Sequence, residues 1–396
     1  MNMISTYVWP GSVHFGYGAV GLLGAEAKAR GASHAFVVAD PGVIAAGLLE
    51  PVAHSFRAAC LSYTVYDRVK ANPDTGSVDA AGQAARESQA DLIVGLGGGS
   101  SLDTAKAVQL IAGGGGRIAE YALRLGDRAR PAPRQLPPLI AIPTTAGTGS
   151  EVTPWAVVTE AAQKLKISVG GSFLMPAVAL IDPELTLRLP PFLTAATGMD
   201  ALSHCIEAYV SIRENSALDP MILHGIDLIG RSLRPAVGLG VRPPDEQAHR
   251  AARSEMALAA MIGGIAISSK WLGACHSLAH QLSGFANVHH GLANALMLPH
   301  QMAYSLSGAL ERYARIGQAL GASANGSLQE RAMRAVEAVR QLTLDVGLPT
   351  RLRDVGVLEE MILPMAENAY KQDTNWMTNP LPISQVVMED LYREAL

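Results

Sequence analysis

Four side chains of this sequence belong to the types that bind transition metals: Asp200, His204, His276 and His290. Asp200 and His204 stand four residues apart in GMDALSHCIEAYV, so on a helix they share one face and can point to one spot. His276 and His290 follow in GACHSLAHQLSGFANVHHGLANALMLPH. One carboxylate and three imidazoles can form a complete ligand set for a divalent transition metal.

A buried network of hydrogen-bonded histidines is the alternative, and the spacing alone leaves both interpretations open. Five of the eleven histidines fall between residues 276 and 300, and this clustering favours a site. His289 and His290 are adjacent and point in different directions, so we expect only one of them to bind a metal. Gly291 permits close approach of the backbone beside His290. His300, which follows a proline, is interpreted as structural.

A glycine-rich segment, GLGGGSSLDTAK (95–106), follows the apolar run DLIVG and opens a helical pattern. Glycines in such a turn let backbone N–H groups approach a phosphate, and the helix N-terminus adds partial positive charge. Asp103 lies in the first turn, where it could cap the helix or bind part of a ligand. A tight turn without a ligand is the alternative interpretation.

A second glycine sequence, GYGAVG (16–21), matches GxGxxG and precedes a predicted strand that ends in Asp40. That layout is typical of a dinucleotide fingerprint with an acid for the ribose. The preceding WPGSVHF is a poor central strand, because a proline and a glycine interrupt it. Asp40 can contact the adenosine ribose under either interpretation. A carboxylate there would repel a 2′-phosphate, which favours NAD over NADP.

Short β-branched runs alternate with helical patterns in the first half of the chain, which predicts a mostly parallel sheet covered by helices. The predicted strands are AFVVAD (35–40), SYTVYD (62–67), LIVGLG (92–97), LIAIPTT (139–145) and AVALID (177–182). The predicted helices between them include residues 25–30, 78–88 and 102–112. From residue 193 strand signals stop and helical spacing dominates. We therefore expect an α/β nucleotide-binding domain over 1–187 and an all-α metal-binding domain over 188–396.

The composition narrows the class of protein. Hydrophobic content of 49% with 17% charged residues is ordinary for a folded enzyme, and a net charge of −4 without a basic stripe argues against nucleic acid as a partner. The three cysteines fit neither a disulfide framework nor a CxxC metal pattern, which favours a reducing compartment. The N-terminus lacks the pattern of a secretion signal, and ALAAMIGGIAIS (257–268) is too short to span a bilayer. A cytoplasmic protein with no membrane partner is expected.

Taken together, these motifs resemble the iron-containing (group III) alcohol dehydrogenase family. The resemblance runs from the FGYG segment near residue 15 to NPLP at 379–382. The motifs that carry it are GGGSSLDTAKA, PTTAGTGSEVT, GMDALSHCIEAYVS, HSLAHQLSG and HHGLANALMLPH. It implies a dehydroquinate synthase-like fold, in which an α/β nucleotide-binding domain precedes a helical metal-binding domain.

The resemblance also assigns roles to individual residues. It implies that the metal ligands are Asp200, His204, His276 and His290. It places His280 near the reacting carbon, without a bond to the metal. It implies a cofactor site made of Asp40, Gly97, Gly98, Gly99, Ser100, Asp103, Thr144, Thr145 and Lys166. The 95–103 turn is thereby favoured over GYGAVG for the pyrophosphate.

The implied reaction is the reversible oxidation of a small alcohol or diol to its aldehyde or ketone, with hydride passing to NAD. The metal would act as a Lewis acid on the substrate oxygen, and His280 would pass the proton toward solvent. The resemblance favours Fe²⁺, while a ligand set of nitrogen and oxygen alone also allows Zn²⁺, Co²⁺ or Mn²⁺. A homodimer or larger homo-oligomer is expected.

Three alternatives stay open. The first is a relative that acts on a polyol or sugar acid, such as a glycerol dehydrogenase or a dehydroquinate synthase. The second is a metal-free reductase of the maleylacetate type, against which the full aspartate and histidine set argues. The third is a nucleotide-binding protein without catalytic activity.

Overall fold

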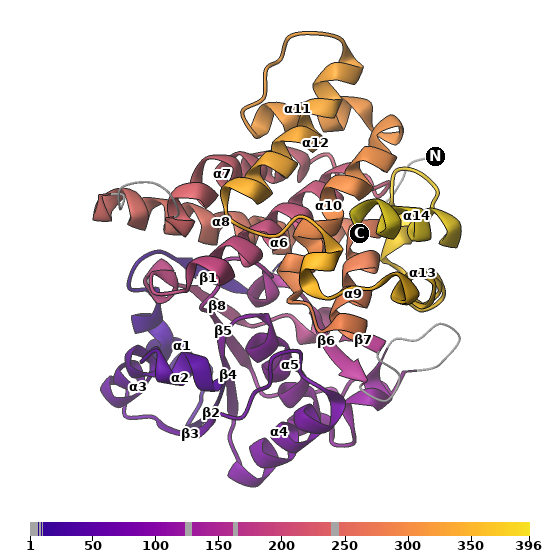
Figure 1. Cartoon of the computed structure of the whole chain (residues 1–396). Helices are drawn as coiled ribbons and strands as arrows, with labels where there is room; N and C mark the ends of the chain where they lie inside the picture. Colours follow the sequence, from indigo (N-terminus) through magenta and orange to yellow (C-terminus); the bar gives the residue numbers. More distant parts are fainter. Residues whose placement is uncertain (1–6, 8, 10, 123–128, 161–164, 239–244) are drawn as a thin grey trace. The chain divides into compact units, whose positions relative to one another are not determined.

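The computed structural model describes residues 7, 9, 11–122, 129–160, 165–238 and 245–396, which form two compact units (Figure 1). One unit, called here the sheet unit, spans Val8–Thr145 and Gly149–Arg188. The other, called here the helical unit, contains Leu189–Leu396 together with Ala146–Thr148.

The sheet unit is built on a six-stranded parallel sheet with the strand order β1-β8-β5-β4-β2-β3. Its strands are β1 (Ser12–Phe15), β2 (His34–Ala39), β3 (Ser62–Tyr66), β4 (Leu92–Gly97), β5 (Leu139–Pro143) and β8 (Val178–Ile181). All five predicted strands are confirmed. The central strands are continuous apolar runs because both faces of a parallel sheet are buried.

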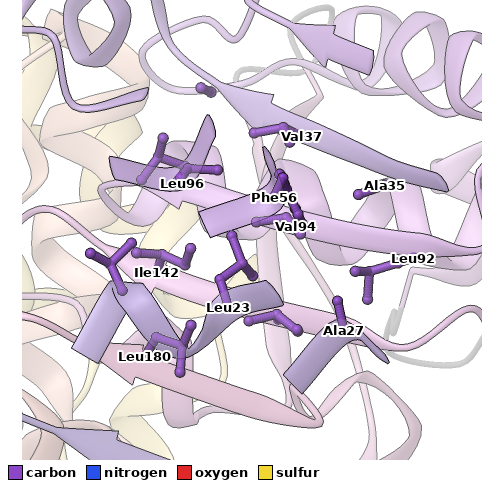
Figure 2. Packing of buried hydrophobic residues seen from close by; sticks show 14 of the residues in the cluster. Leu23, Ala27, Ala35, Val37, Phe56, Leu92, Val94, Leu96, Ile142 and Leu180 are labelled. Carbon is purple, nitrogen blue, oxygen red and sulfur yellow. The ribbon is translucent and has the colours of Figure 1, made fainter. Parts of the chain in front are cut away.

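Alternate residues of these strands enter two different hydrophobic clusters. Val37 and Val94 pack with Leu23 and Phe56 from the helices on one face of the sheet (Figure 2). Phe36, one residue before Val37, belongs to the second cluster, with residues of the helices Thr75–Ser88 and Gly99–Gly114. Each fully buried aliphatic or aromatic side chain contributes about 1.5–3 kcal/mol to folding. The two clusters therefore fix the register that brings the ends of neighbouring strands together.

The described part of the sheet unit contains five α-helices: α1 (Leu23–Ala29), α2 (Pro41–Ala45), α3 (Leu49–Ala58), α4 (Thr75–Ser88) and α5 (Gly99–Gly114). Ala39 at the end of β2 pairs with Leu96 near the end of β4, and Gly97 pairs with Pro143 at the end of β5. The loops that follow these three strands consequently leave the same edge of the sheet. In parallel α/β sheets this edge is where ligands bind.

An antiparallel hairpin of β6 (Trp155–Glu160) and β7 (Leu165–Gly170) was not among the predicted strands. It forms a separate two-stranded sheet, so the alternation of strand and helix that predicts the main sheet does not apply to it. β1 was likewise not predicted. It lies at the edge of the main sheet, where an interrupting proline and glycine in the preceding segment are tolerated.

The described part of the helical unit contains nine α-helices, and the fold class is as predicted. They are α6 (Pro191–Val210), α7 (Asp219–Val237), α8 (Glu246–Lys270), α9 (Ala274–Ala286), α10 (His290–Ser305), α11 (Leu310–Ala319), α12 (Leu328–Asp345), α13 (Glu359–Gln372) and α14 (Gln385–Ala395). The helical pattern extends to the end of the chain, beyond residue 340. The apolar stretch at 257–268 is part of α8 and is mostly buried.

No single helix among the described residues is long and apolar enough to cross a membrane. The helices α8 and α9 reach the required length and composition only as a pair, across a bend of 109°.

Candidate metal and nucleotide sites

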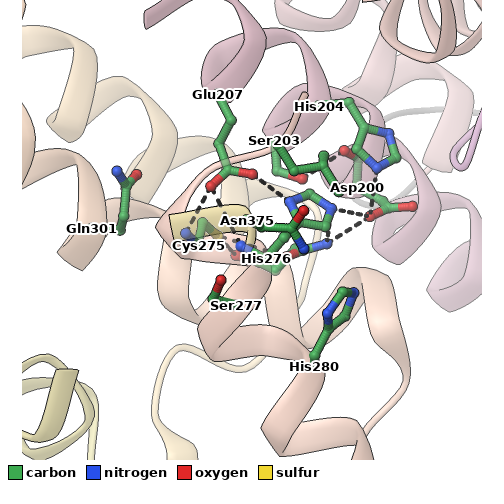
Figure 3. A network of polar contacts seen from close by, with 12 residues as sticks. Asp200, Ser203, His204, Glu207, Cys275, His276, Ser277, His280, Gln301 and Asn375 are labelled. Atoms are coloured by element: carbon green, nitrogen blue, oxygen red, sulfur yellow. Dashed lines mark hydrogen bonds and ion pairs between the residues drawn. The ribbon is translucent and has the colours of Figure 1, made fainter. Parts of the chain in front are cut away.

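Three helices of the helical unit bring the four predicted metal ligands together. Figure 3 shows Asp200, His204 and His276 of this group. Asp200 and His204 lie on α6, His276 lies on α9, and α10 begins at His290. One ligand atom from each residue lies within 4.8 Å of the other three. The Nε2 atom of His290 is 3.4 Å from Asp200 Oδ1, and the Nε2 atoms of His204 and His276 are each 3.8 Å from it.

These separations fit the coordination of a small divalent cation. Four nitrogen and oxygen atoms bound tetrahedrally at about 2.1 Å lie about 3.4 Å from one another. The observed spacing of 3.4–3.8 Å from Asp200 Oδ1 is close to that value. Imidazole nitrogen with one carboxylate suits Fe²⁺, Zn²⁺, Co²⁺ or Mn²⁺.

The protonation states of the cluster also suit a metal. Burial alone would raise the pKa of Asp200, but the three neighbouring imidazoles lower it to about 2. Burial, reinforced by His204, holds the pKa of His276 well below its usual value. Asp200 is therefore ionised and His276 neutral at pH 7, which are the states that bind a cation.

Glu207, also on α6, fixes the orientation of His276 through the second ring nitrogen (Figure 3). The Nδ1–H of His276 donates to Glu207 Oε2, so Nε2 carries the lone pair that faces Asp200. The backbone N–H of Cys275 donates to Glu207 Oε1 over 2.7 Å. Burial raises the pKa of Glu207 to about 7, against the lowering by its backbone N–H donors. Such a carboxylate–histidine pair is the usual outer support of a metal-binding imidazole.

Asn294 supports the carboxylate ligand in a similar way. Its side-chain Nδ2 lies 2.7 Å from Asp200 Oδ1, to which it donates, and 3.0 Å from Nε2 of His276. Asn294 reaches this position because it lies one turn after His290 on α10. A Cβ atom on Gly291 would lie 2.2 Å from the carbonyl oxygen of Ala196, so the start of α10 could not approach α6 with a larger residue there. This confirms the close approach predicted for Gly291.

His280 lies beside the cluster, with its ring centroid 6.1 Å from that of His276 and 5.4 Å from that of His290. Its Nδ1 lies 2.7 Å from Asp373 Oδ2. Burial would raise the pKa of Asp373, but the hydrogen bond and charge of His280 hold it below its usual value. Asp373 is therefore an acceptor, and the Nδ1 of His280 is the donor. This arrangement leaves the Nε2 of a neutral His280 as a proton acceptor.

The glycine turn of the sheet unit connects β4 to the N-terminus of α5. Gly97 has a φ of 146°, and a Cβ atom there would lie 2.4 Å from Ser101 Oγ. Gly98 is the N-cap residue of α5, and no side chain among the described residues accepts from the first N–H groups of that helix. Gly99 and Ser100 form the first positions of α5. The free N–H groups at the start of a 16-residue helix make a suitable site for a phosphate.

Asp40 lies directly beside this turn. Its Oδ2 accepts from the hydroxyl of Ser101 over 3.1 Å, and its Oδ1 accepts from the N–H of Val43 at the start of α2. The rival glycine sequence forms a 3-10 helix at Ala19–Leu22 instead, following the edge strand β1. The contact between Asp40 and the 97–101 segment therefore favours this turn over GYGAVG.

Asp103 does not cap α5, because its two oxygens are engaged elsewhere. Oδ1 accepts from the hydroxyl of Ser150 over 2.6 Å, and Oδ2 accepts from the N–H of Val157 over 3.0 Å. The expected cap fails because the chain places Gly98, five residues earlier, at the N-cap position. Asp103 thus ties α5 to the β6 strand within the sheet unit.

The remaining cofactor candidates lie at different distances from the glycine turn. The N–H of Thr144 donates to the carbonyl oxygen of Gly97 over 3.0 Å. The methyl carbon of Thr145 would lie 3.2 Å from a Cβ atom on Gly98. Lys166 lies on β7 and donates to Asn72 over 3.2 Å, and burial lowers the pKa of its ammonium group to about 8. The two threonines are thus brought to the turn, whereas Lys166 interacts electrostatically with Asp103, further along α5.

Two family models match most of the chain. The model described as iron-containing alcohol dehydrogenase matches residues 10–183, and the model of the C-terminal part of the Fe-containing alcohol dehydrogenase family matches residues 194–396. The chain belongs to the iron-containing alcohol dehydrogenase family. It is therefore an oxidoreductase of the alcohol dehydrogenase type, as the resemblance predicted.

Members of the iron-containing alcohol dehydrogenase family resemble this chain over its whole length. It is 37% identical over 395 residues to the NAD-dependent methanol dehydrogenase of Bacillus methanolicus, with 100% of both chains covered. It is 36% identical over 392 residues to the 1,3-propanediol dehydrogenase of Klebsiella pneumoniae, with 98% of each covered. A crystal structure of a 1,3-propanediol oxidoreductase superposes with a TM-score of 0.92 at 36% identity, covering 100% of both chains.

Three residues that support the predicted site did not emerge from the sequence. Glu207 follows His204 by three residues and lies on the same face of α6, so helical spacing could have indicated it. Asn294 likewise follows His290 by one turn. Asp373 is 93 residues from His280, and no local pattern indicates such a pairing.

Proposed function

We propose that this family member interconverts a small alcohol or diol and its aldehyde or ketone, with NAD as the hydride carrier. Asp200, His204, His276 and His290 would hold a divalent metal ion. The observation that carries the proposal is the convergence of these four groups, with the Nε2 atoms of three imidazoles within 3.4–3.8 Å of one carboxylate oxygen.

When bound, the cation would supply a Lewis acid for the substrate oxygen, and NAD would supply the hydride acceptor. The side chains of this protein have complementary tasks. Glu207 and Asn294 hold His276 and Asp200 in the orientation that a cation requires. Asp373 keeps the proton of His280 on Nδ1, so that Nε2 can take up the alcohol proton and release it to solvent.

The nucleotide would bind at the glycine turn. The N–H groups of Gly98, Gly99 and Ser100 are oriented by the start of α5 toward a pyrophosphate, and Gly97 lets the chain turn without a side chain. Asp40 would accept from the ribose hydroxyls and repel a 2′-phosphate, which supports NAD over NADP. Thr144, Thr145, Lys166 and Asp103 complete the proposed cofactor site, and Asp103 also anchors α5.

Fe²⁺ is the proposed metal, on the strength of the family, and the ligand set also accommodates Zn²⁺. The names of the methanol and propanediol dehydrogenases support a short alcohol or diol as substrate. We place the protein in the cytoplasm because its three cysteines are all free. A homodimer or larger homo-oligomer completes the proposal.

A panel of primary alcohols, diols and hydroxy acids tests the proposal, assayed with NAD and NADP on iron-loaded and zinc-loaded protein. We expect net NADH formation, measured at 340 nm, with at least one short alcohol or diol and much less activity with NADP. A dehydroquinate synthase-like reaction would give no net NADH. Activity that survives complete removal of metal by a chelator would instead support a maleylacetate-type reductase.

A further inference from the structure

A cavity of about 550 Å³ lies in the helical unit among α10, α12, α14 and the 3-10 helix Leu352–Val355. It is separate from the cluster of metal ligands, and none of the proposed site residues lines it. Its volume falls within the range of small-molecule pockets, about 300–1,000 Å³.

One part of the lining, called here the floor, is apolar and belongs to α10. Ala295, Leu296 and Pro299 line it. At about 100° per residue, Ala295 and Pro299 lie roughly 140° and 180° around the helix from His290. The helix that presents His290 to the metal cluster thus presents an apolar surface to the cavity on its other side.

Three guanidinium groups form the basic part of the wall, from Arg340, Arg351 and Arg353. All three residues are exposed, and no carboxylate within the described part of the chain pairs with any of them. Arg312 and Arg234 of the same unit, in contrast, each bind an aspartate, over 2.8 and 2.7 Å. The three groups therefore keep their hydrogen-bond donors available to a ligand.

One acidic side chain and one histidine also face the cavity. Glu394 Oε2 lies 3.8 Å from Nδ1 of His300. Burial, with the nearby Arg340, lowers the pKa of His300, so its ring is neutral at pH 7. Three guanidinium groups against the single carboxylate of Glu394 leave the wall with a net positive charge.

We propose that this cavity binds an organic anion, a phosphate or carboxylate attached to a short apolar body. Guanidinium groups bind both headgroups through paired hydrogen bonds, and the floor formed by α10 would cover the apolar part. The inference does not depend on the proposed reaction, because the cavity shares no residue with the proposed site.

Isothermal titration calorimetry of the whole, metal-loaded protein tests the inference, with hexyl phosphate, hexanoate and inorganic phosphate as probes. Saturating NAD is present, so that the glycine turn is occupied by its own ligand. We expect one molecule of hexyl phosphate or hexanoate per chain, bound more tightly than inorganic phosphate. The comparison of the two organic probes decides which headgroup the cavity prefers.

The variants Arg340→Gln and Arg353→Gln should each weaken the binding by about tenfold. Arg134→Gln is the matched control, since it removes an exposed arginine of the sheet unit that does not line the cavity. Its affinity should stay within about twofold of the parent. Circular dichroism confirms that the exposed substitutions leave the fold intact. The proposal is overturned if neither organic anion binds, if inorganic phosphate binds equally well, or if Arg134→Gln weakens binding as much.

Discussion

Replacing Glu207 by Gln tests whether the hydrogen bond behind His276 is needed to hold the metal. The carboxylate of Glu207 accepts from the Nδ1–H of His276 and from the N–H of Cys275. A glutamine in the same place has only one acceptor oxygen. Its NH₂ group must face one of these two donors, whichever way the amide is oriented.

The facing donors are relieved most easily if the His276 ring changes its tautomer. If the proton moves to Nε2, the ring accepts from the new NH₂ group, but its lone pair no longer faces Asp200. Loss of such an outer partner typically costs about 10–100-fold in metal affinity, or about 1.4–2.7 kcal/mol. We expect Glu207→Gln to bind iron or zinc that much more weakly.

Competition against a chelator of known affinity measures the metal affinity of the parent and the variant at pH 7.5. Glu151→Gln is the matched control, because burial raises the pKa of both carboxyl groups to about 7 and Glu151 belongs to the sheet unit. Its metal affinity should equal that of the parent. If Glu207→Gln keeps the parent's affinity, or if Glu151→Gln loses as much, Glu207 does not hold the metal site through His276.

Three further predictions concern the proton relay, the glycine turn and the stability of the protein. Asp373→Asn should lower kcat by about 10²-fold or more while the metal content stays unchanged. Ser277→Ala, which removes another hydrogen bond of Asp373, should change kcat only slightly. Steady-state kinetics with metal analysis measures both effects, and equal losses in the two variants would contradict the proton relay. Gly97→Ala should weaken NAD binding by at least about tenfold and lower the Tm. The backbone at this position is left-handed and the new Cβ atom collides with the side chain of Ser101, a strain of about 1–3 kcal/mol. The Cβ atom of Gly21→Ala meets open space, so NAD binding should stay unchanged in that variant, and the opposite pattern would favour GYGAVG as the phosphate loop. Burial raises the pKa of Glu151 from 4.5 to about 7. Between these two values the folded state keeps the proton of Glu151, whereas the unfolded state has lost it. The contribution of Glu151 to the free energy of unfolding is therefore complete below about pH 4.5 and is lost as the pH rises to 7. Glu151→Gln should therefore flatten the fall of Tm between pH 4.5 and 7 in metal-free protein, and an unchanged profile would contradict the assignment.

Local spacing predicts only part of the metal cluster. The four-residue interval between Asp200 and His204 is sufficient to place both on one face of α6. Nothing in the spacing of His276 and His290 requires them to meet that face, because their helices are brought to α6 by long-range packing. The resemblance to a family supplied that link, and the structure shows the four groups together.

The supporting contacts were harder to predict, because they join residues far apart in the chain. Glu207 and Cys275 are 68 residues apart, and Asn294 and Asp200 are 94 residues apart. Asp103 shows the converse case. Its position at the start of a helix suggested a cap, but long-range donors from Ser150 and Val157 occupy both of its oxygens.

The main sheet was easier to predict than the hairpin. The strands β2, β4, β5 and β8 are short apolar runs buried on both faces, which is the pattern of a parallel sheet. The strands β6 and β7 mix polar and apolar residues and pair only with each other in their sheet. This mixed pattern does not indicate which strand each would pair with, so the two strands could not be predicted from the sequence.

Anomalous diffraction from crystals of the iron-loaded protein, measured at the iron absorption edge, shows whether Asp200 and the three histidines hold the metal. We predict one peak per chain, about 2.1 Å from a carboxylate oxygen of Asp200 and from the Nε2 atoms of His204, His276 and His290. The same data from His276→Ala should show that peak lost or greatly reduced. A peak bound by other residues, or no peak in protein that shows full iron-dependent activity, would contradict the account.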